Sequence, residues 1–161
     1  MKNRIYIETS VISYLTARLS NDLTVAAHQR VTADWWEQRR EAFDLVISNF
    51  VVFEALRGDA EAAFERMAIL ENLPRLAENE AVENLANLLL KERALPAKAR
   101  LDALHIAVAA VHEVDYLLTW NFKHIANAEM LGQIEVICRT FGANPPRICS
   151  PLELLEKPYV Q

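Results

Sequence analysis

Apolar and polar positions alternate along the chain in short blocks that predict strands and helices in turn. Short apolar runs bounded by polar residues predict buried or extended segments over residues 4–7, 43–47, 74–76, 116–119 and 147–149. Blocks with helical spacing predict helices over residues 11–19, 24–40, 50–56, 60–70, 81–92, 96–112, 125–139 and 152–155. Strands that alternate with helices indicate an α/β sandwich around a mostly parallel sheet.

Capping residues are expected at several of these boundaries. Ser10 suits the N-cap of the first helix, and Gly58 suits the C-terminal cap of the helix over 50–56. Pro96 and Pro151 fit the first turns of the helices that follow them. Glycine is otherwise scarce, since the chain has only 3. This scarcity excludes a P-loop, a GxGxxG turn and a GxSxG elbow.

Length, charge and cysteine content narrow the classes of protein. The 161 residues suit one domain, 1–161, and the net charge of −5 argues against a protein that merely coats nucleic acid. An acidic enzyme can still approach phosphate through bound cations. Cys138 and Cys149 lack CxxC spacing, so we expect free thiols in a reducing compartment. There is no signal-peptide pattern and no membrane-length apolar run, so we expect a cytoplasmic chain with no membrane partner.

Three acidic residues interrupt apolar runs, where an unpaired carboxylate is costly. Glu8 closes the first strand, and its alternative role is a favourable place in the first turn of a helix. Glu54 lies in an apolar helix, where the alternative is a solvated position paired with Arg57 or with a lysine elsewhere. Asp102 lies in the most apolar helix, and its alternative is a buried salt bridge with Arg100 or Arg57. Each acid is therefore a candidate for chemistry at the sheet edge.

Polar residues near Asp102 extend the candidate site. His105 lies three residues later on the same helix face, and Asn121 follows the strand over 116–119. Asn121 suits cation ligation or an Asx-turn. Carboxylate and amide oxygens without cysteine ligands favour Mg²⁺ or Mn²⁺ over zinc. We expect His105 and His124 to be supporting groups or ordinary core and surface residues rather than primary ligands.

Taken together, these segments resemble the PIN-domain family, and among its members the VapC toxins of toxin–antitoxin pairs. The resemblance covers nearly the whole chain and rests on the following segments: Ile5–Val11, Ile47–Ser48 running to Glu54, Leu101–Ala107, Leu118–Phe122 and Pro146–Leu155. It implies a Rossmann-like three-layer α/β/α sandwich. It also implies an acidic pocket that binds Mg²⁺ or Mn²⁺ and cleaves RNA phosphodiester bonds.

The resemblance assigns catalytic roles to Glu8, Glu54, Asp102 and Asn121, and metal ligation to the three acids. Two residues depart from the family pattern, because Glu8 stands where aspartate is usual and Asn121 stands where a fourth acid is usual. A longer ligand shifts the metal, and a neutral amide weakens a second metal position. The neighbouring hydroxyl groups are expected to orient a water or a phosphate oxygen, and they belong to Thr9, Ser10 and Thr119.

RNA contacts and protein partners are further expectations. Basic residues around Asp102 and Asn121 are candidates for phosphate contact, namely Lys91, Arg93, Lys98, Arg100 and Lys123. The alternative is a solvated helix face with pairs such as Lys98 with Asp102. The resemblance implies a protein antitoxin, and we expect a homodimer. The Trp35–Trp36 segment suits either such an interface or the core.

Two rival functions remain open at this point. A PIN-like module that has lost catalysis would bind RNA or a protein partner, and the departures at Glu8 and Asn121 motivate this alternative. A metal-dependent phosphatase of small molecules would converge on the same acids. The lack of a phosphate-cradling glycine loop or a DxD motif counts against the phosphatase.

Overall fold

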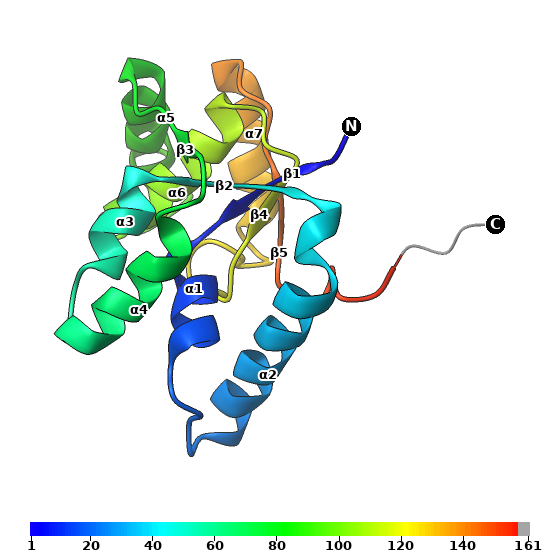
Figure 1. The fold of residues 1–161 in the computed structure, drawn as a ribbon. Helices are drawn as coiled ribbons and strands as arrows, with labels where there is room; N and C mark the ends of the chain where they lie inside the picture. The colour runs from blue at the N-terminus through cyan, green and yellow to red at the C-terminus, as the bar shows by residue number, and fades with distance from the viewer. Residues whose placement is uncertain (158–161) are drawn as a thin grey trace.

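A parallel five-stranded sheet lies at the centre of the computed structural model, which describes residues 1–157 (Figure 1). The strands are β1 (Arg4–Ile7), β2 (Asp44–Ser48), β3 (Arg75–Leu76), β4 (Tyr116–Leu118) and β5 (Arg147–Cys149). Their order across the sheet is β3-β2-β1-β4-β5. In the register, Tyr6 of β1 pairs with Val46 of β2 and with Leu117 of β4. The predicted α/β class is therefore confirmed.

Helices cover both faces of this sheet and complete a Rossmann-like three-layer sandwich. They are α1 (Thr9–Thr16), α2 (Leu23–Gln38), the 3-10 turn η1 (Arg40–Ala42), α3 (Asn49–Ala55), α4 (Ala60–Leu70), α5 (Glu80–Lys91), α6 (Arg100–Val111) and α7 (Leu131–Phe141). The chain steps from β1 to β3 in one direction across the sheet and from β3 to β5 in the other. Because crossovers between parallel strands are right-handed, the helices of these two halves lie on opposite faces.

The strand order reverses between β1 and β4, which makes the carboxyl ends of these two strands the topological switch point of the sheet. Ligands of open α/β sheets bind in the crevice at this point. The backbone N–H of Glu8 donates to the carbonyl of Leu118 at 3.1 Å, so the two strand ends are joined directly. The residues that follow β1 and β4 are consequently brought side by side.

Two predicted caps differ in the structure. Helix α1 begins at Thr9, and Glu8 is its N-cap, because the Glu8 carboxylate accepts from the Ser10 backbone N–H at 3.2 Å. The Ser10 hydroxyl is engaged with Glu8 itself and so does not cap the helix as predicted. Helix α3 ends at Ala55 with Leu56 as its C-cap, while Gly58 lies beyond the cap with a φ of 86°.

Three predicted helices start late or are turns. Pro96 precedes α6 in a turn closed by Ala99 N–H donating to its carbonyl at 2.8 Å. Helix α7 begins at Leu131 rather than at residue 125, since Asn127 binds the backbone of Lys123 and Glu129 and holds turns there. Residues 152–155 form turns, because the Ser150 N–H and hydroxyl both donate to the Glu153 carboxylate.

The core sits between the sheet and its helices. Trp35 is fully buried and Trp36 is partly buried against the core, so the first of these tryptophans contributes to packing. Cys138 and Cys149 are free and buried, as expected. Burial raises the pKa of the Cys138 thiol to about 11 and that of Cys149 to about 12. Within residues 1–157, no helix has both the length and the apolar character needed to cross a membrane.

Candidate functional site

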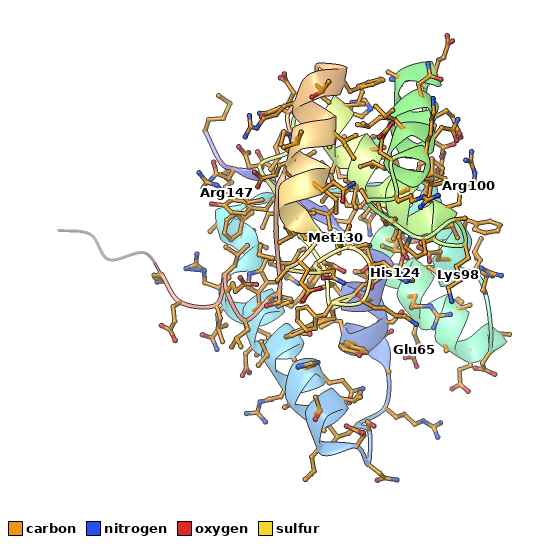
Figure 2. All side chains as sticks on the ribbon, turned by 180° about the vertical axis from the view of Figure 1, so that it is seen from behind. Glu65, Lys98, Arg100, His124, Met130 and Arg147 are labelled. Carbon is orange, nitrogen blue, oxygen red and sulfur yellow. The ribbon has the colours of Figure 1, made fainter. Side chains whose placement is uncertain are left out.

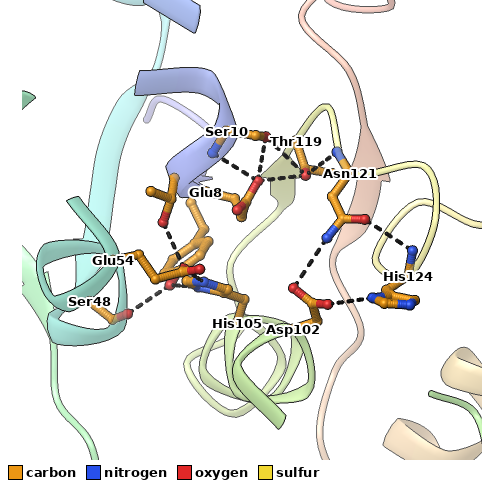
Figure 3. Close-up of polar contacts among 11 residues, drawn as sticks. Glu8, Ser10, Ser48, Glu54, Asp102, His105, Thr119, Asn121 and His124 are labelled. Carbon is orange, nitrogen blue, oxygen red and sulfur yellow. Dashed lines mark hydrogen bonds and ion pairs between the residues drawn. The ribbon is translucent and has the colours of Figure 1, made fainter. Parts of the chain in front are cut away.

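Glu8 stands at the centre of the switch point, directly after β1. Its side chain is buried, with the residue only 5% exposed, and its Oε2 oxygen accepts from two hydroxyl groups. The Thr119 hydroxyl donates from the end of β4 at 2.7 Å, and the Ser10 hydroxyl donates from α1 (Figure 3). The Trp120 backbone N–H in turn donates to the Ser10 hydroxyl oxygen at 2.8 Å. One carboxylate oxygen thus links the ends of both strands.

Glu54 approaches the same crevice from α3. Its Oε1 oxygen accepts from the Thr9 hydroxyl at 2.9 Å and from Nε2 of His105 on α6. Among residues 1–157 no salt bridge joins Glu54 to Arg57, whose guanidinium instead lies over the Phe53 ring, 5.5 Å from its centroid. The alternative of a solvated Glu54 paired with Arg57 is therefore wrong.

A buried hydrogen-bond relay stands behind His105. The His105 Nδ1 atom lies 2.6 Å from the Tyr6 hydroxyl, and that hydroxyl lies 2.7 Å from the Ser48 hydroxyl. Tyr6, Ser48 and His105 are all fully buried. The relay joins β1, β2 and α6, and it fixes the orientation of the imidazole that contacts Glu54.

The charges of Glu54 and His105 support each other. Burial acts to raise the pKa of Glu54, but the hydrogen bonds from His105 and Thr9 outweigh it and the pKa is lowered. Burial likewise acts to lower the pKa of His105, but the bond to Glu54 and the nearby Glu8 and Asp102 carboxylates raise it overall. Burial raises the pKa of Tyr6 well above its ordinary value, so its hydroxyl stays protonated. An imidazolium that donates from both ring nitrogens satisfies Glu54 and Tyr6 together.

Asp102 forms a second polar group on the other side of Glu8. Its Oδ1 accepts from the Asn121 amide at 3.1 Å, and its Oδ2 lies 2.7 Å from the His124 Nδ1 (Figure 3). The Asn121 carbonyl oxygen accepts from the His124 backbone N–H at 3.0 Å, which closes a ring of three residues. The alternative of a buried salt bridge from Asp102 to an arginine is wrong within the described residues, since Asp102 contacts His124 and Arg100 pairs with Glu83 instead.

The groups that could bind a cation agree only in part with those that the resemblance implies. Ligand atoms of Glu8, Glu54 and His105 all lie within 4.8 Å of one another, while Asp102 is outside this group. The structure therefore brings together two of the three expected ligands, and beside them lies His105, whose two ring nitrogens are already engaged with Tyr6 and Glu54. Ligation by Asp102 remains a prediction. The contacts of Tyr6, Ser48 and His124 were not predicted, and their partners are too distant in sequence for any local pattern to indicate them.

The basic residues expected to contact RNA differ in their availability. Arg100 donates to Asn87 at 2.8 Å and pairs with Glu83, so its charge is already partnered. Lys98 and Lys123 are exposed, and neither forms a salt bridge with any residue in the range 1–157. The expected alternative pair of Lys98 with Asp102 is therefore absent from this range. Figure 2 shows Lys98 and Arg100 at the end of α6 that also carries Asp102.

Comparison with known proteins identifies no relative, since no family model, no curated protein and no solved structure matches the chain. Fold and site nevertheless define a class. The protein is an α/β domain with a carboxylate–imidazole cluster at the carboxyl ends of parallel strands. Such a cluster offers carboxylate oxygen ligands to a divalent cation.

Proposed function

We propose that this protein is a metal-dependent endoribonuclease of the PIN type that hydrolyses RNA phosphodiester bonds as the toxin of a toxin–antitoxin pair. The observation that supports this proposal most directly is the convergence of Glu8 and Glu54, with His105, within 4.8 Å at the switch point of the sheet. Glu8 follows β1, Glu54 lies on α3 and His105 lies on α6, so three separate parts of the chain contribute to the cluster.

Each of the two glutamates has one oxygen in use and one oxygen to spare. Oε2 of Glu8 receives the Ser10 and Thr119 hydroxyls, and Oε1 of Glu54 receives Thr9 and His105. The remaining oxygen of each carboxylate has no hydrogen-bond partner among residues 1–157. Preorganised carboxylates with a spare oxygen suit a hard cation such as Mg²⁺ or Mn²⁺.

Glu8, Glu54 and Asp102 would hold this ion, in the arrangement that the resemblance implies. The ion, when bound, would supply the positive charge that activates water and stabilises the scissile phosphate. Ser10 and Thr119 keep Glu8 in place, while His105 keeps Glu54 in place. Asn121 acts on Asp102 through its amide rather than as a charged ligand. The chain thereby presents a fixed cluster of carboxylates at which RNA phosphate would meet the cation.

RNA cleavage by the purified chain tests the proposal. Labelled RNA is incubated with Mn²⁺, with Mg²⁺ and with EDTA, using the natural chain, Glu54→Gln and Asp102→Ala. Glu65→Gln is the matched control, since Glu65 is an exposed glutamate on α4 away from the cluster. We expect metal-dependent cleavage that Glu54→Gln and Asp102→Ala abolish and Glu65→Gln preserves. Cleavage that survives in EDTA, or that all four proteins share, would refute the proposal.

A second candidate is a PIN-like module that binds RNA or a protein without cleaving it. The neutral Asn121 beside Asp102 favours it, because one expected negative charge is missing from the site. Mn²⁺ binding separates the two, since calorimetric titration should show a site in the enzyme and none in the binding module. The toxin role further implies a cytoplasmic protein, an antitoxin partner and a homodimer, which sedimentation with and without the neighbouring gene product would test.

A further inference from the structure

An exposed aromatic ring lies next to the candidate site. Phe122 follows Asn121 directly, so its Cα lies about 3.8 Å from that of the residue whose amide contacts Asp102. Its residue is 48% exposed, whereas the preceding Trp120 is only 7% exposed. An aromatic ring that is half open to solvent near the polar cluster offers an apolar contact to a ligand that extends beyond that cluster.

This ring is held in place by other aromatic residues. It meets the Trp120 ring edge-on, with centroids 5.9 Å apart and planes at 88°, and meets the His28 ring at 6.1 Å and 74°. Trp120 and His28 stack on each other at 4.1 Å, and the Trp120 indole N–H donates to Thr32 at 2.8 Å. A ring anchored in this way loses little conformational entropy when a ligand binds.

A free positive charge follows the ring in sequence. Lys123 is exposed and forms no salt bridge within the described part of the chain, although the protein as a whole carries a net charge of −5. An aromatic ring and a neighbouring cation are the two features that single-stranded nucleic acid needs, one for a base and one for the backbone phosphate. A paired base cannot use such a ring, because its faces are already stacked.

We infer that Phe122 and Lys123 form a nucleotide-binding subsite that stacks one unpaired base of RNA on the Phe122 ring and contacts its phosphate through Lys123. This inference rests on the proposed function and adds to it a position outside the acidic pocket. Phe122 selects an unpaired base, and the stacking tolerates any base identity because every base has a π face.

Binding of fluorescein-labelled, unstructured RNA tests the subsite, measured by anisotropy with Mg²⁺ in a Glu54→Gln background so that the RNA is not consumed. Phe122→Ala should weaken binding by about 5- to 150-fold, the usual effect of losing one stacked base. Phe122→Trp should retain RNA binding, because tryptophan also offers an aromatic face to the base. Phe64→Ala is the matched control, because Phe64 is 76% exposed on α4 and should leave binding unchanged. Lys123→Gln should reduce the slope of log affinity against log salt concentration by about one, which corresponds to the loss of one phosphate contact.

An RNA with single abasic positions identifies the stacked base. At one position, the abasic RNA should bind the protein with Phe122 as weakly as the intact RNA binds Phe122→Ala. Combining the abasic position with Phe122→Ala should weaken binding no further. Thermal unfolding of each variant shows whether the fold is intact. The subsite is refuted if Phe122→Ala binds RNA within twofold of the affinity of its parent. It is also refuted if the affinity lost in Phe122→Ala adds to the affinity lost at every abasic position. Cleavage by the natural chain together with either result refutes the subsite alone, whereas the absence of metal-dependent cleavage refutes the proposed nuclease.

Discussion

Replacement of Tyr6 by phenylalanine isolates the buried relay behind His105. The Tyr6 hydroxyl lies 2.7 Å from the Ser48 hydroxyl and 2.6 Å from His105 Nδ1, and all three residues are fully buried. Phenylalanine keeps the ring and removes only the oxygen, so packing is nearly conserved. The substitution therefore measures hydrogen bonding rather than loss of apolar contact.

The expected cost follows from the groups left behind. Each lost hydrogen bond is worth about 0.5–1.5 kcal/mol, and a buried group left unsatisfied costs about 1–3 kcal/mol. Relaxation and shared penalties keep the total below the sum, so we expect Tyr6→Phe to lower the free energy of unfolding by about 2–4 kcal/mol. In a domain of this size, that loss lowers Tm by roughly 5–15 °C. Since the pKa of Tyr6 is raised well above 10.0, ionisation of the Tyr6 hydroxyl itself makes no contribution to this cost at neutral pH.

Urea unfolding in EDTA gives this free energy without any contribution from metal. Tyr14→Phe is the control, because no hydrogen bond involves the Tyr14 hydroxyl among residues 1–157, and it should change stability by less than about 0.5 kcal/mol. Ser48→Ala and the double variant complete a cycle, in which the two losses should be less than additive. A loss below about 1 kcal/mol for Tyr6→Phe would show that the relay is not formed.

Two further predictions concern the rest of the site. In EDTA, the excess stability of the natural chain over Glu54→Gln should be greatest between pH 4.5 and 6.5, since the pKa of Glu54 is lowered from 4.5 and that of His105 is raised from 6.5. It should decline as the pH rises through the folded pKa of His105 and as it falls through that of Glu54, and a flat profile in urea titrations would contradict the ion pair. His124→Asn keeps a donor near the position of Nδ1 and should nearly preserve Mn²⁺ affinity. His124→Ala should lower that affinity about 10- to 100-fold in calorimetry. Equal Mn²⁺ affinities for the two variants would show that Asp102 is not a ligand.

Sequence patterns predicted the sheet more accurately than the helix ends. The strands over 4–7 and 147–149 are confirmed to the residue, and among the helices only the one over 60–70 is. Helix boundaries depend on competing side chains. Asn127 diverts the chain into turns before α7, and Glu153 does the same after Ser150, although both segments have helical spacing.

The sequence predicted the site residues only where a charged side chain interrupted an apolar run. Glu8 and Glu54 were conspicuous as charges in apolar runs, and the structure brings them together. Tyr6 gave no such signal, since tyrosine is ordinary in a strand and its partner His105 lies 99 positions away. The contact of His124 with Asp102 was likewise not visible, because it depends on how the loop after β4 folds back over α6.

The two departures from the PIN pattern take on a physical meaning in this arrangement. The longer Glu8 reaches Ser10 and Thr119 with one oxygen and keeps the other available, so the extra methylene is compatible with a ligand. Asn121 donates to Asp102 through its amide, and a carboxylate in that place would instead repel Asp102 unless a second cation lay between them. The amide removes the need for that second cation. In the proposed enzyme, the residue present at 121 therefore favours a single ion, which Glu8, Glu54 and Asp102 would hold.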